Sequence, residues 1–157
     1  MIARKRRIEG VTDYKARANL LKGNIPRLVI RVSNRYVLVQ YVKSVSSQDY
    51  IISGSNSKEL AEFGWKKIGS LKSISAAYLT GYLAVKKVHD KENEAKAILD
   101  LGLKRSSKGS RIFSALKGAI DAGLKISCDK EMLPDEARIK KEADVDAIKE
   151  KINKKFV

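Results

Sequence analysis

The sequence predicts an α/β protein in which helices pack against a mixed β-sheet and a charged helical tail follows. Residues 27–53 contain three segments rich in β-branched residues and separated by turn residues, which is typical of antiparallel strands. Helical and strand-like apolar patterns then alternate as far as residue 128, which indicates strands connected through helices. Of the 157 residues, 43% are hydrophobic, which is enough for one packed core.

The first half of the chain is expected to form a short helix and a three-stranded meander. Residues 12–23 have helical spacing, with Thr12 as the N-cap. Residues 27–33 alternate apolar side chains with a face that leans basic, and a polar turn leads from them into a second strand over 36–43. These two strands should form a hairpin, and a third strand is expected near residues 49–53.

The second half is expected to alternate helices with short strands. Its predicted elements are a helical turn over residues 60–63, a helix over 75–90, a strand over 95–101, a helix that starts at Ser110 and ends at Gly123, a last short strand over 124–128, and one or two charged helices after residue 135. The apolar residues of the helix over 75–90 cover a wide surface, so we expect this helix to pack against the sheet.

Positive charge is concentrated in particular segments of the chain, whose formal charge is +15. Ten basic and two acidic side chains lie in residues 1–35, seven and three in 58–91, six and one in 104–125, and eight of each in 126–157. Such clustering indicates a polyanionic partner rather than a generally basic soluble protein. We expect a basic N-terminal arm and short helix at 1–25, an α/β domain that binds this polyanion at 26–128, and a charged C-terminal helical extension at 129–157.

The residues favour a binding protein over an enzyme, a metalloprotein or a membrane protein. One cysteine, Cys128, and one histidine, His89, supply neither a disulfide nor a zinc site, and no motif for a cofactor or small-molecule substrate is found. Asp49 and Asp100 are the acids near predicted strands, and two dispersed carboxylates make a weak nuclease site. No apolar run could cross a bilayer and no signal peptide is evident, so we expect a soluble intracellular protein.

Several short segments, taken in order, resemble the archaeal form of the large-subunit ribosomal protein eighteen family. They are residues 12–17 (TDYKAR), 26–29 (PRLV), 33–36 (SNRY), 57–60 (SKEL), 64–66 (GWK), 76–81 (AAYLTG) and 108–118 (KGSRIFSALKG). The resemblance spans roughly residues 4–140. It is specific because the order and spacing of the segments agree with those of the family.

This resemblance implies a ribonuclease-H-like sandwich with a mixed five-stranded sheet. It implies a structural component of the large ribosomal subunit, not an enzyme, that works in the cytoplasm without a cofactor or metal. Its partners would be 5S rRNA, which it would anchor to 23S rRNA in the central protuberance, and the neighbouring large-subunit ribosomal proteins found there.

The candidate RNA contacts combine cations with a few aromatic and polar side chains. They are Arg4, Lys5, Arg6, Arg7, Tyr14, Lys15, Arg17, Arg27, Arg31, Asn34, Arg35, Tyr36, Lys58, Trp65, Lys66, Lys67, Lys104, Arg105, Lys108, Ser110 and Arg111. We expect the arm over residues 4–7 to be disordered until phosphates separate its charges, and Lys15 and Arg17 to continue the basic track on a helix face that also carries Lys22. Residues 104–111 add hydroxyls and the amides of a helix start, where the helix dipole favours an anion.

Structural alternatives stand beside these assignments. The arm resembles a localisation signal or a solubilising tail, packing is favoured over base stacking for Tyr14, and Trp65 is equally consistent with a core anchor. Residues 104–111 also fit an ordinary strand-to-helix loop. For the whole protein, the alternatives are a non-specific basic RNA-binding protein or RNA chaperone outside the ribosome, and an RNA-directed enzyme that depends on Asp49 or Asp100.

Overall fold

The computed structural model describes residues 5–46, 48–65, 70–91, 95–140 and 145–156, without the side chains of residues 6 and 7. Its elements are α1 (Lys5–Ile8), α2 (Tyr14–Leu21), β1 (Arg27–Val32), β2 (Val37–Val45), β3 (Gln48–Asn56), η1 (Ser57–Phe63), α3 (Ile74–His89), β4 (Ile98–Asp100), α4 (Arg111–Asp121), η3 (Lys130–Met132), α5 (Glu136–Lys140) and α6 (Val145–Lys155). Among the described helices, α3 is the longest, and none is long and apolar enough to cross a membrane.

The strands form one mixed sheet in the order β3-β2-β1-β4, which confirms the predicted mixture of directions. β1 pairs antiparallel with β2, β2 pairs antiparallel with β3, and β1 pairs parallel with β4. The turn over residues 33–36 closes the β1–β2 hairpin, where the Ser33 amide donates to the Tyr36 carbonyl at 2.9 Å. The helical crossover through α3 is what allows β4 to lie parallel to β1.

The sheet contains four strands in the described part of the chain, and the predicted strand over 124–128 contributes one isolated bridge. Lys125 pairs with Lys96 there, in the parallel sense. The preceding amide, that of Leu124, donates to the Ala119 carbonyl and so belongs to the end of α4. The predicted strand is therefore reduced to the bridge at Lys125.

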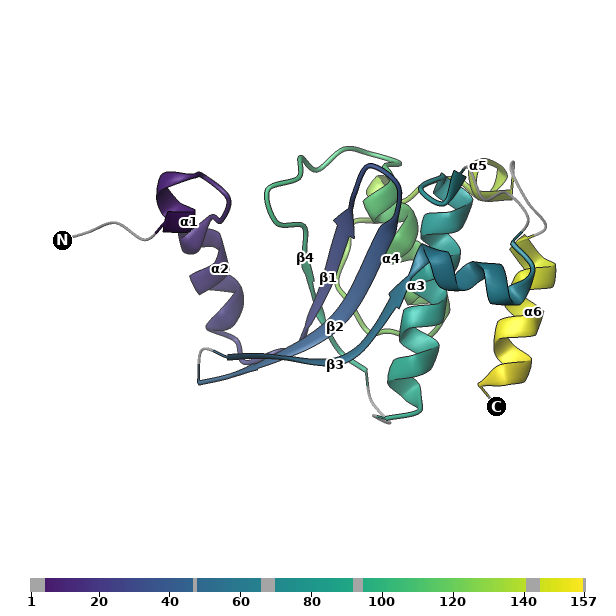
Figure 1. Ribbon diagram of the computed structural model, residues 1–157, viewed down its shortest axis with the longest axis horizontal. Helices are drawn as coiled ribbons and strands as arrows, with labels where there is room; N and C mark the ends of the chain where they lie inside the picture. The colour runs from purple at the N-terminus through teal and green to yellow at the C-terminus, as the bar shows by residue number, and fades with distance from the viewer. Residues whose placement is uncertain (1–4, 47, 66–69, 92–94, 141–144, 157) are drawn as a thin grey trace.

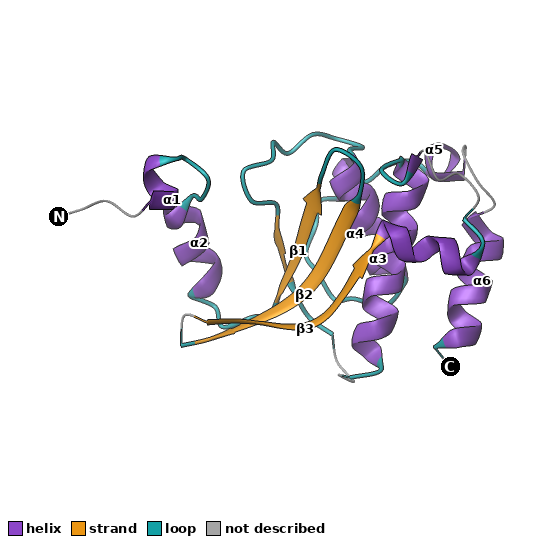
Figure 2. Ribbon diagram, viewed as in Figure 1, coloured by secondary structure: helices purple, strands orange, loops and turns teal. Residues whose placement is uncertain are grey.

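The core lies between one face of the sheet and the helices (Figures 1 and 2). Leu28 and Ile30 of β1 and Val39 and Tyr41 of β2 point toward the helices and are 0–1% exposed. α3 packs on β2 and β3, and α4 packs on β1. Because side chains alternate along a strand, the intervening residues of β1 and β2 face away from these helices.

The C-terminal segment completes this core, although its composition is strongly charged. Ile139 of α5 and Val145, Ile148 and Ile152 of α6 are all buried, and α6 lies beside α3 (Figure 1). The predicted helical tail is thus confirmed as two helices, and both pack against α3.

The N-terminal segment differs from expectation in two respects. Lys5–Ile8 forms one helical turn, so the expected disorder of the arm is wrong for these residues. Asp13, not Thr12, is the N-cap of α2, because its carboxylate accepts hydrogen bonds from the amides of Lys15 and Ala16, both at 3.0 Å.

Two glycines allow α3 and α4 to approach until their backbones touch. A Cβ atom placed on Gly81 of α3 would lie 1.9 Å from the Ala115 carbonyl oxygen of α4. A Cβ atom on Gly118 of α4 would lie 2.0 Å from the Tyr78 carbonyl oxygen of α3. Both contacts are with backbone, which cannot rotate away, so each position requires glycine.

Replacing Gly81 by alanine should lower the free energy of unfolding by about 2–4 kcal/mol, although alanine is the better helix former. The added methyl group must push the helices apart and disturb the core between them. Urea unfolding of Gly81→Ala and of the control Gly23→Ala measures this. A Cβ atom on Gly23 meets only the Ile25 side chain at 3.7 Å, so the control should stay within about 0.5 kcal/mol of wild type. Equal stabilities of the two variants would contradict the close-packing explanation.

Candidate nucleic-acid interface

Three basic segments that are far apart in the sequence leave the sheet at the same edge. β1, β3 and β4 run in one direction, because β1 is parallel to β4 and β2 is antiparallel to both β1 and β3. The hairpin turn follows β1, η1 follows β3, and a loop over residues 101–110 follows β4. We call the cations of these segments and of the first residue of α4 the basic edge, which comprises Arg35, Lys58, Lys104, Arg105, Lys108 and Arg111.

The hairpin turn is rigid and presents exposed polar groups. The Ser33 hydroxyl oxygen accepts from the Tyr36 amide and donates to the Tyr36 carbonyl, both at 2.9 Å. Asn34 and Arg35 are exposed at the tip. The Lys58 ammonium group lies 4.4 Å from the centre of the Tyr36 ring, so η1 and the turn are joined by a cation–π contact.

The loop over residues 101–110 is exposed in its middle and fixed at both ends. The Gly102 amide donates to the Asp100 carboxylate at 2.9 Å, and the Gly109 amide donates to the Met132 carbonyl at 3.0 Å. Between these anchors, Lys104, Arg105 and Lys108 are exposed. The loop therefore displays its cations between two fixed ends.

The loop ends at the start of α4, where a phosphate would find several donors. Ser110 occupies the N-cap position but makes no capping hydrogen bond, and its hydroxyl has no partner among the described residues. The first amides of a helix lack intrahelical partners and carry partial positive charge. Arg111 is exposed in the first turn of α4. The helix-start amides and Arg111 suit an anion, whereas the Ser110 hydroxyl is buried, so RNA contact at this loop stays a prediction.

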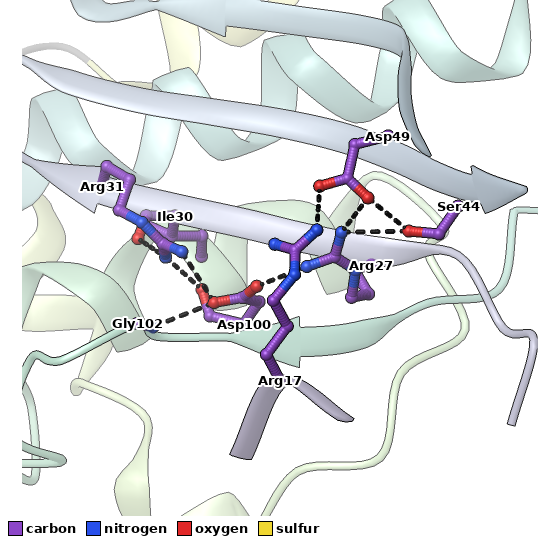
Figure 3. Close-up of polar contacts among 8 residues, drawn as sticks. All are labelled: Arg17, Arg27, Ile30, Arg31, Ser44, Asp49, Asp100 and Gly102. Carbon is purple, nitrogen blue, oxygen red and sulfur yellow. Dashed lines mark hydrogen bonds and ion pairs between the residues drawn. The ribbon is translucent and has the colours of Figure 1, made fainter. Parts of the chain in front are cut away.

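An arginine–aspartate network occupies the sheet face that points away from α3 and α4 (Figure 3). The Arg27 guanidinium donates to Asp100 and to Asp49, both at 2.8 Å. Arg31 donates to the other Asp100 carboxylate oxygen at 2.8 Å, and Arg17 of α2 donates to the other Asp49 oxygen at 2.6 Å. The network thus joins α2, β1, β3 and β4.

This arrangement changes the roles of three predicted RNA contacts. Arg27 is 2% exposed and has its guanidinium held between two carboxylates, so it is not part of an accessible surface. Arg31 is 42% exposed but is paired with Asp100. Arg17 turns toward the sheet, whereas Lys15 and Lys22 are exposed, so the three cations expected on one helix face are separated.

The two carboxylates of the network remain ionised at neutral pH. Burial alone raises the pKa of Asp49, but hydrogen bonds from Ser44, Arg17 and Arg27 outweigh burial and lower this pKa to about 2. Burial likewise raises the pKa of Asp100, and hydrogen bonds and charge from Arg31, with help from Gly102 and Arg27, bring it below its usual value. Both carboxylates are occupied by guanidinium groups, and no cluster of metal-ligating side chains exists among the described residues.

The remaining candidates fall into three groups. Lys5 and Lys15 are exposed, and Tyr14 is half-buried at the start of α2. Trp65 is 4% exposed within the hydrophobic core, which favours the core-anchor alternative. Arg4, Lys66 and Lys67 and the side chains of Arg6 and Arg7 lie outside the described residues.

Sequence reasoning missed the role of Asp49 and Asp100 as partners of arginines. The sequence contains only a weak signal for this pairing. Arg27 and Arg31 are four residues apart in a strand and so share a face, and any acid on that face of a neighbouring strand could pair with them.

Asp49 should contribute to the stability of the fold only where its carboxylate is ionised. Because its folded pKa of about 2 lies below the ordinary value of 3.8, its contribution should be complete above about pH 5 and be lost as the pH falls through 3.8 toward 2. The stability difference between wild type and Asp49→Asn, measured by urea unfolding, should therefore shrink over this range. A difference that stays constant down to about pH 2 would contradict this role.

Comparison with known proteins identifies the family. The family model for ribosomal large subunit proteins 60S L5 and 50S L18 matches residues 2–95 and 84–129. The large ribosomal subunit protein uL18 of Korarchaeum cryptofilum is 47% identical over 138 residues, which cover 88% of this chain and 69% of that protein. The proteins of the same name from Methanobrevibacter smithii and Thermofilum pendens are 46% and 44% identical, over 86% and 88% of this chain and 68% and 69% of their own lengths. The resemblance inferred from the short segments is thereby confirmed: the chain belongs to the family of large-subunit ribosomal proteins that includes 60S L5 and 50S L18.

Proposed function

We propose that this chain is a structural component of the large ribosomal subunit in the cytoplasm, where it binds 5S rRNA and anchors it to 23S rRNA in the central protuberance. The observation that carries this proposal is the basic edge, where three separate segments of the chain bring their cations together. Lysines and arginines that meet phosphates release condensed counterions, so such a surface supplies affinity for RNA without catalytic geometry. Proteins of this family are ribosomal components and not enzymes.

Two separate basic surfaces favour a protein that holds two RNA segments. The basic edge lies at the ends of β1, β3 and β4, whereas Lys5, Lys15 and Lys22 lie on the N-terminal helices. In Figure 1, α1 and α2 stand at one end of the molecule and the packed helices at the other, with the sheet between them. Neighbouring proteins of the central protuberance would then complete the contacts of the chain.

We further infer that the sheet has the ribonuclease-H-like arrangement implied by the family, with residues 124–128 at the position of a fifth strand. Supporting this, the Ala97 amide donates to the Lys125 carbonyl at 3.1 Å, and the Lys125 amide donates to the Ala95 carbonyl at 2.9 Å. These bonds continue the sheet just before β4 begins. In the same proposal, residues 1–25 act as an RNA-binding arm, 26–128 as the RNA-binding domain, and 129–157 as a brace without an RNA role.

The fixed geometry of the basic edge argues against a general RNA chaperone. A chaperone that binds RNA through charge alone needs no rigid turn, whereas here the turn over residues 33–36 and both ends of the loop over 101–110 are hydrogen-bonded. Phosphate contacts alone position a protein without reading bases, so selectivity would come from the shape of these combined surfaces.

A competition titration tests the proposed partner. Labelled 5S rRNA is bound to the full chain and displaced by unlabelled 5S rRNA, transfer RNA or duplex DNA at two salt concentrations. We expect 5S rRNA to compete at least about tenfold better than the other two, and this preference to survive the higher salt. Equal competition that collapses with salt would leave a non-specific RNA-binding protein.

Removing three cations of the basic edge tests the surface itself. The triple variant Arg105→Ala, Lys108→Ala and Arg111→Ala should bind 5S rRNA more weakly, and the slope of log affinity against log salt should flatten by up to about three units. The control replaces Lys130, Lys151 and Lys154, which are exposed and outside the basic edge, by alanine. If both triple variants change the slope equally, the basic edge is not a localised RNA surface.

A further inference from the structure

The N-terminal helix α2 is attached to the rest of the molecule in an unusual way. None of its residues is buried, so no apolar side chain anchors it in the core. In the described part of the chain, the ion pair between Arg17 and Asp49, at 2.6 Å, is the side-chain hydrogen bond that ties α2 to the sheet. An eight-residue helix is too short to be stable by itself in water, so this attachment, together with the Asp13 N-cap, helps to keep α2 helical.

Asp49 is well suited to hold Arg17 because it is fixed from the other side. Its second carboxylate oxygen accepts from the buried Arg27 at 2.8 Å and from the Ser44 hydroxyl at 2.5 Å (Figure 3). Arg27 is in turn held by Asp100 at 2.8 Å. Asp49 therefore presents a rigid acceptor to α2, although it is 33% exposed at the surface.

The direction of Arg17 determines where the other cations of α2 point. Successive residues of a helix are about 100° apart, so Lys15 and Lys22 lie on the side of α2 away from Arg17. Both lysines are exposed. Fixing Arg17 against the sheet thus turns Lys15 and Lys22 outward, where a phosphate backbone can reach them.

We propose that Asp49 is a positioning residue for RNA binding: by holding Arg17 it orders α2 with Lys15 and Lys22 facing outward, so this acidic side chain strengthens binding to a polyanion. The inference rests on the RNA-binding function proposed above. It opposes the simple electrostatic expectation, in which removal of any acid from a polyanion-binding protein tightens binding. It also opposes a model in which an RNA phosphate replaces Asp49 as the partner of Arg17. In that model Asp49 competes with the RNA, so its removal would tighten binding.

The test compares Asp49→Asn with Glu62→Gln. Glu62 is also an acid in an ion pair, with Lys155 at 3.2 Å, but it belongs to η1 and its partner to α6, away from α2 (Figure 1). We expect Asp49→Asn to weaken the binding of 5S rRNA about three- to tenfold, because the free energy of one partly buried ion pair corresponds to a change in affinity of this size. Glu62→Gln should bind unchanged or slightly more tightly. Unchanged or tighter binding by Asp49→Asn would overturn the proposal.

A double-mutant cycle separates positioning from a general loss of structure. In an Arg17→Ala background there is no guanidinium for Asp49 to hold, so Asp49→Asn should no longer weaken RNA binding. Arg17→Lys keeps the charge and can keep the single contact, so it should restore most of the affinity that Arg17→Ala loses. If Asp49→Asn weakens binding equally in both backgrounds, Asp49 does not act through Arg17.

Hydrogen exchange of the free protein gives a readout that does not involve RNA. The amides of α2 should exchange faster in Asp49→Asn and in Arg17→Met, while those of α3 stay protected. Arg17→Met leaves the Arg27 contacts intact and keeps this test decisive if Asp49→Asn folds poorly. Unchanged exchange of α2 in Arg17→Met would overturn the proposal.

Running every binding assay with both 5S rRNA and transfer RNA distinguishes the two hypotheses. If wild type binds both RNAs equally, the proposed specificity for 5S rRNA is wrong. The ratio of the RNA affinities of Asp49→Asn and wild type still tests the positioning role of Asp49.

Discussion

The burial of one charged side chain, Arg27, constrains the whole sheet. A guanidinium that is 2% exposed must be neutralised where it lies, and its two carboxylates come from β3 and β4, on opposite sides of β1. Removal of one member of such a buried pair typically costs about 3–5 kcal/mol. A shift of β1 by one residue would turn Arg27 into the apolar core, so the requirement for two partners helps fix the register of the sheet.

The same interaction divides the cations of the chain into two sets. Arg17, Arg27 and Arg31 are used internally, in ion pairs with Asp49 and Asp100. The cations of the basic edge lie on loops and helix starts at the carboxyl ends of β1, β3 and β4, where the backbone is hydrogen-bonded and the side chains are free to meet solvent. Net charge therefore overstates how much of the protein can contact RNA, and position in the fold decides which cations are available.

Local patterns in the sequence predicted most of the fold, because hairpins and amphipathic helices are specified by neighbouring residues. The β1–β2 hairpin and α4 were found in this way. The interior role of Arg27 was not, because its carboxylate partners lie 22 and 73 residues away and a basic residue in a strand ordinarily faces solvent. The burial of α6 was not predicted either, because Ile148 and Ile152 form only a narrow apolar stripe within a segment of balanced charge.

The place of α6 in the core also has a consequence for the order in which the chain can fold during synthesis. Val145, Ile148 and Ile152 cover α3, so that part of the core stays open until these residues have been translated and released from the exit tunnel. The parallel pairing of β1 with β4 already joins distant segments, which slows folding. The cationic helices α1 and α2 emerge before α3 and α6, and so long before the hydrophobic surface is closed. The nascent protein thus passes through a stage in which it is at once strongly basic and incompletely packed, the kind of state that chaperones protect from aggregation.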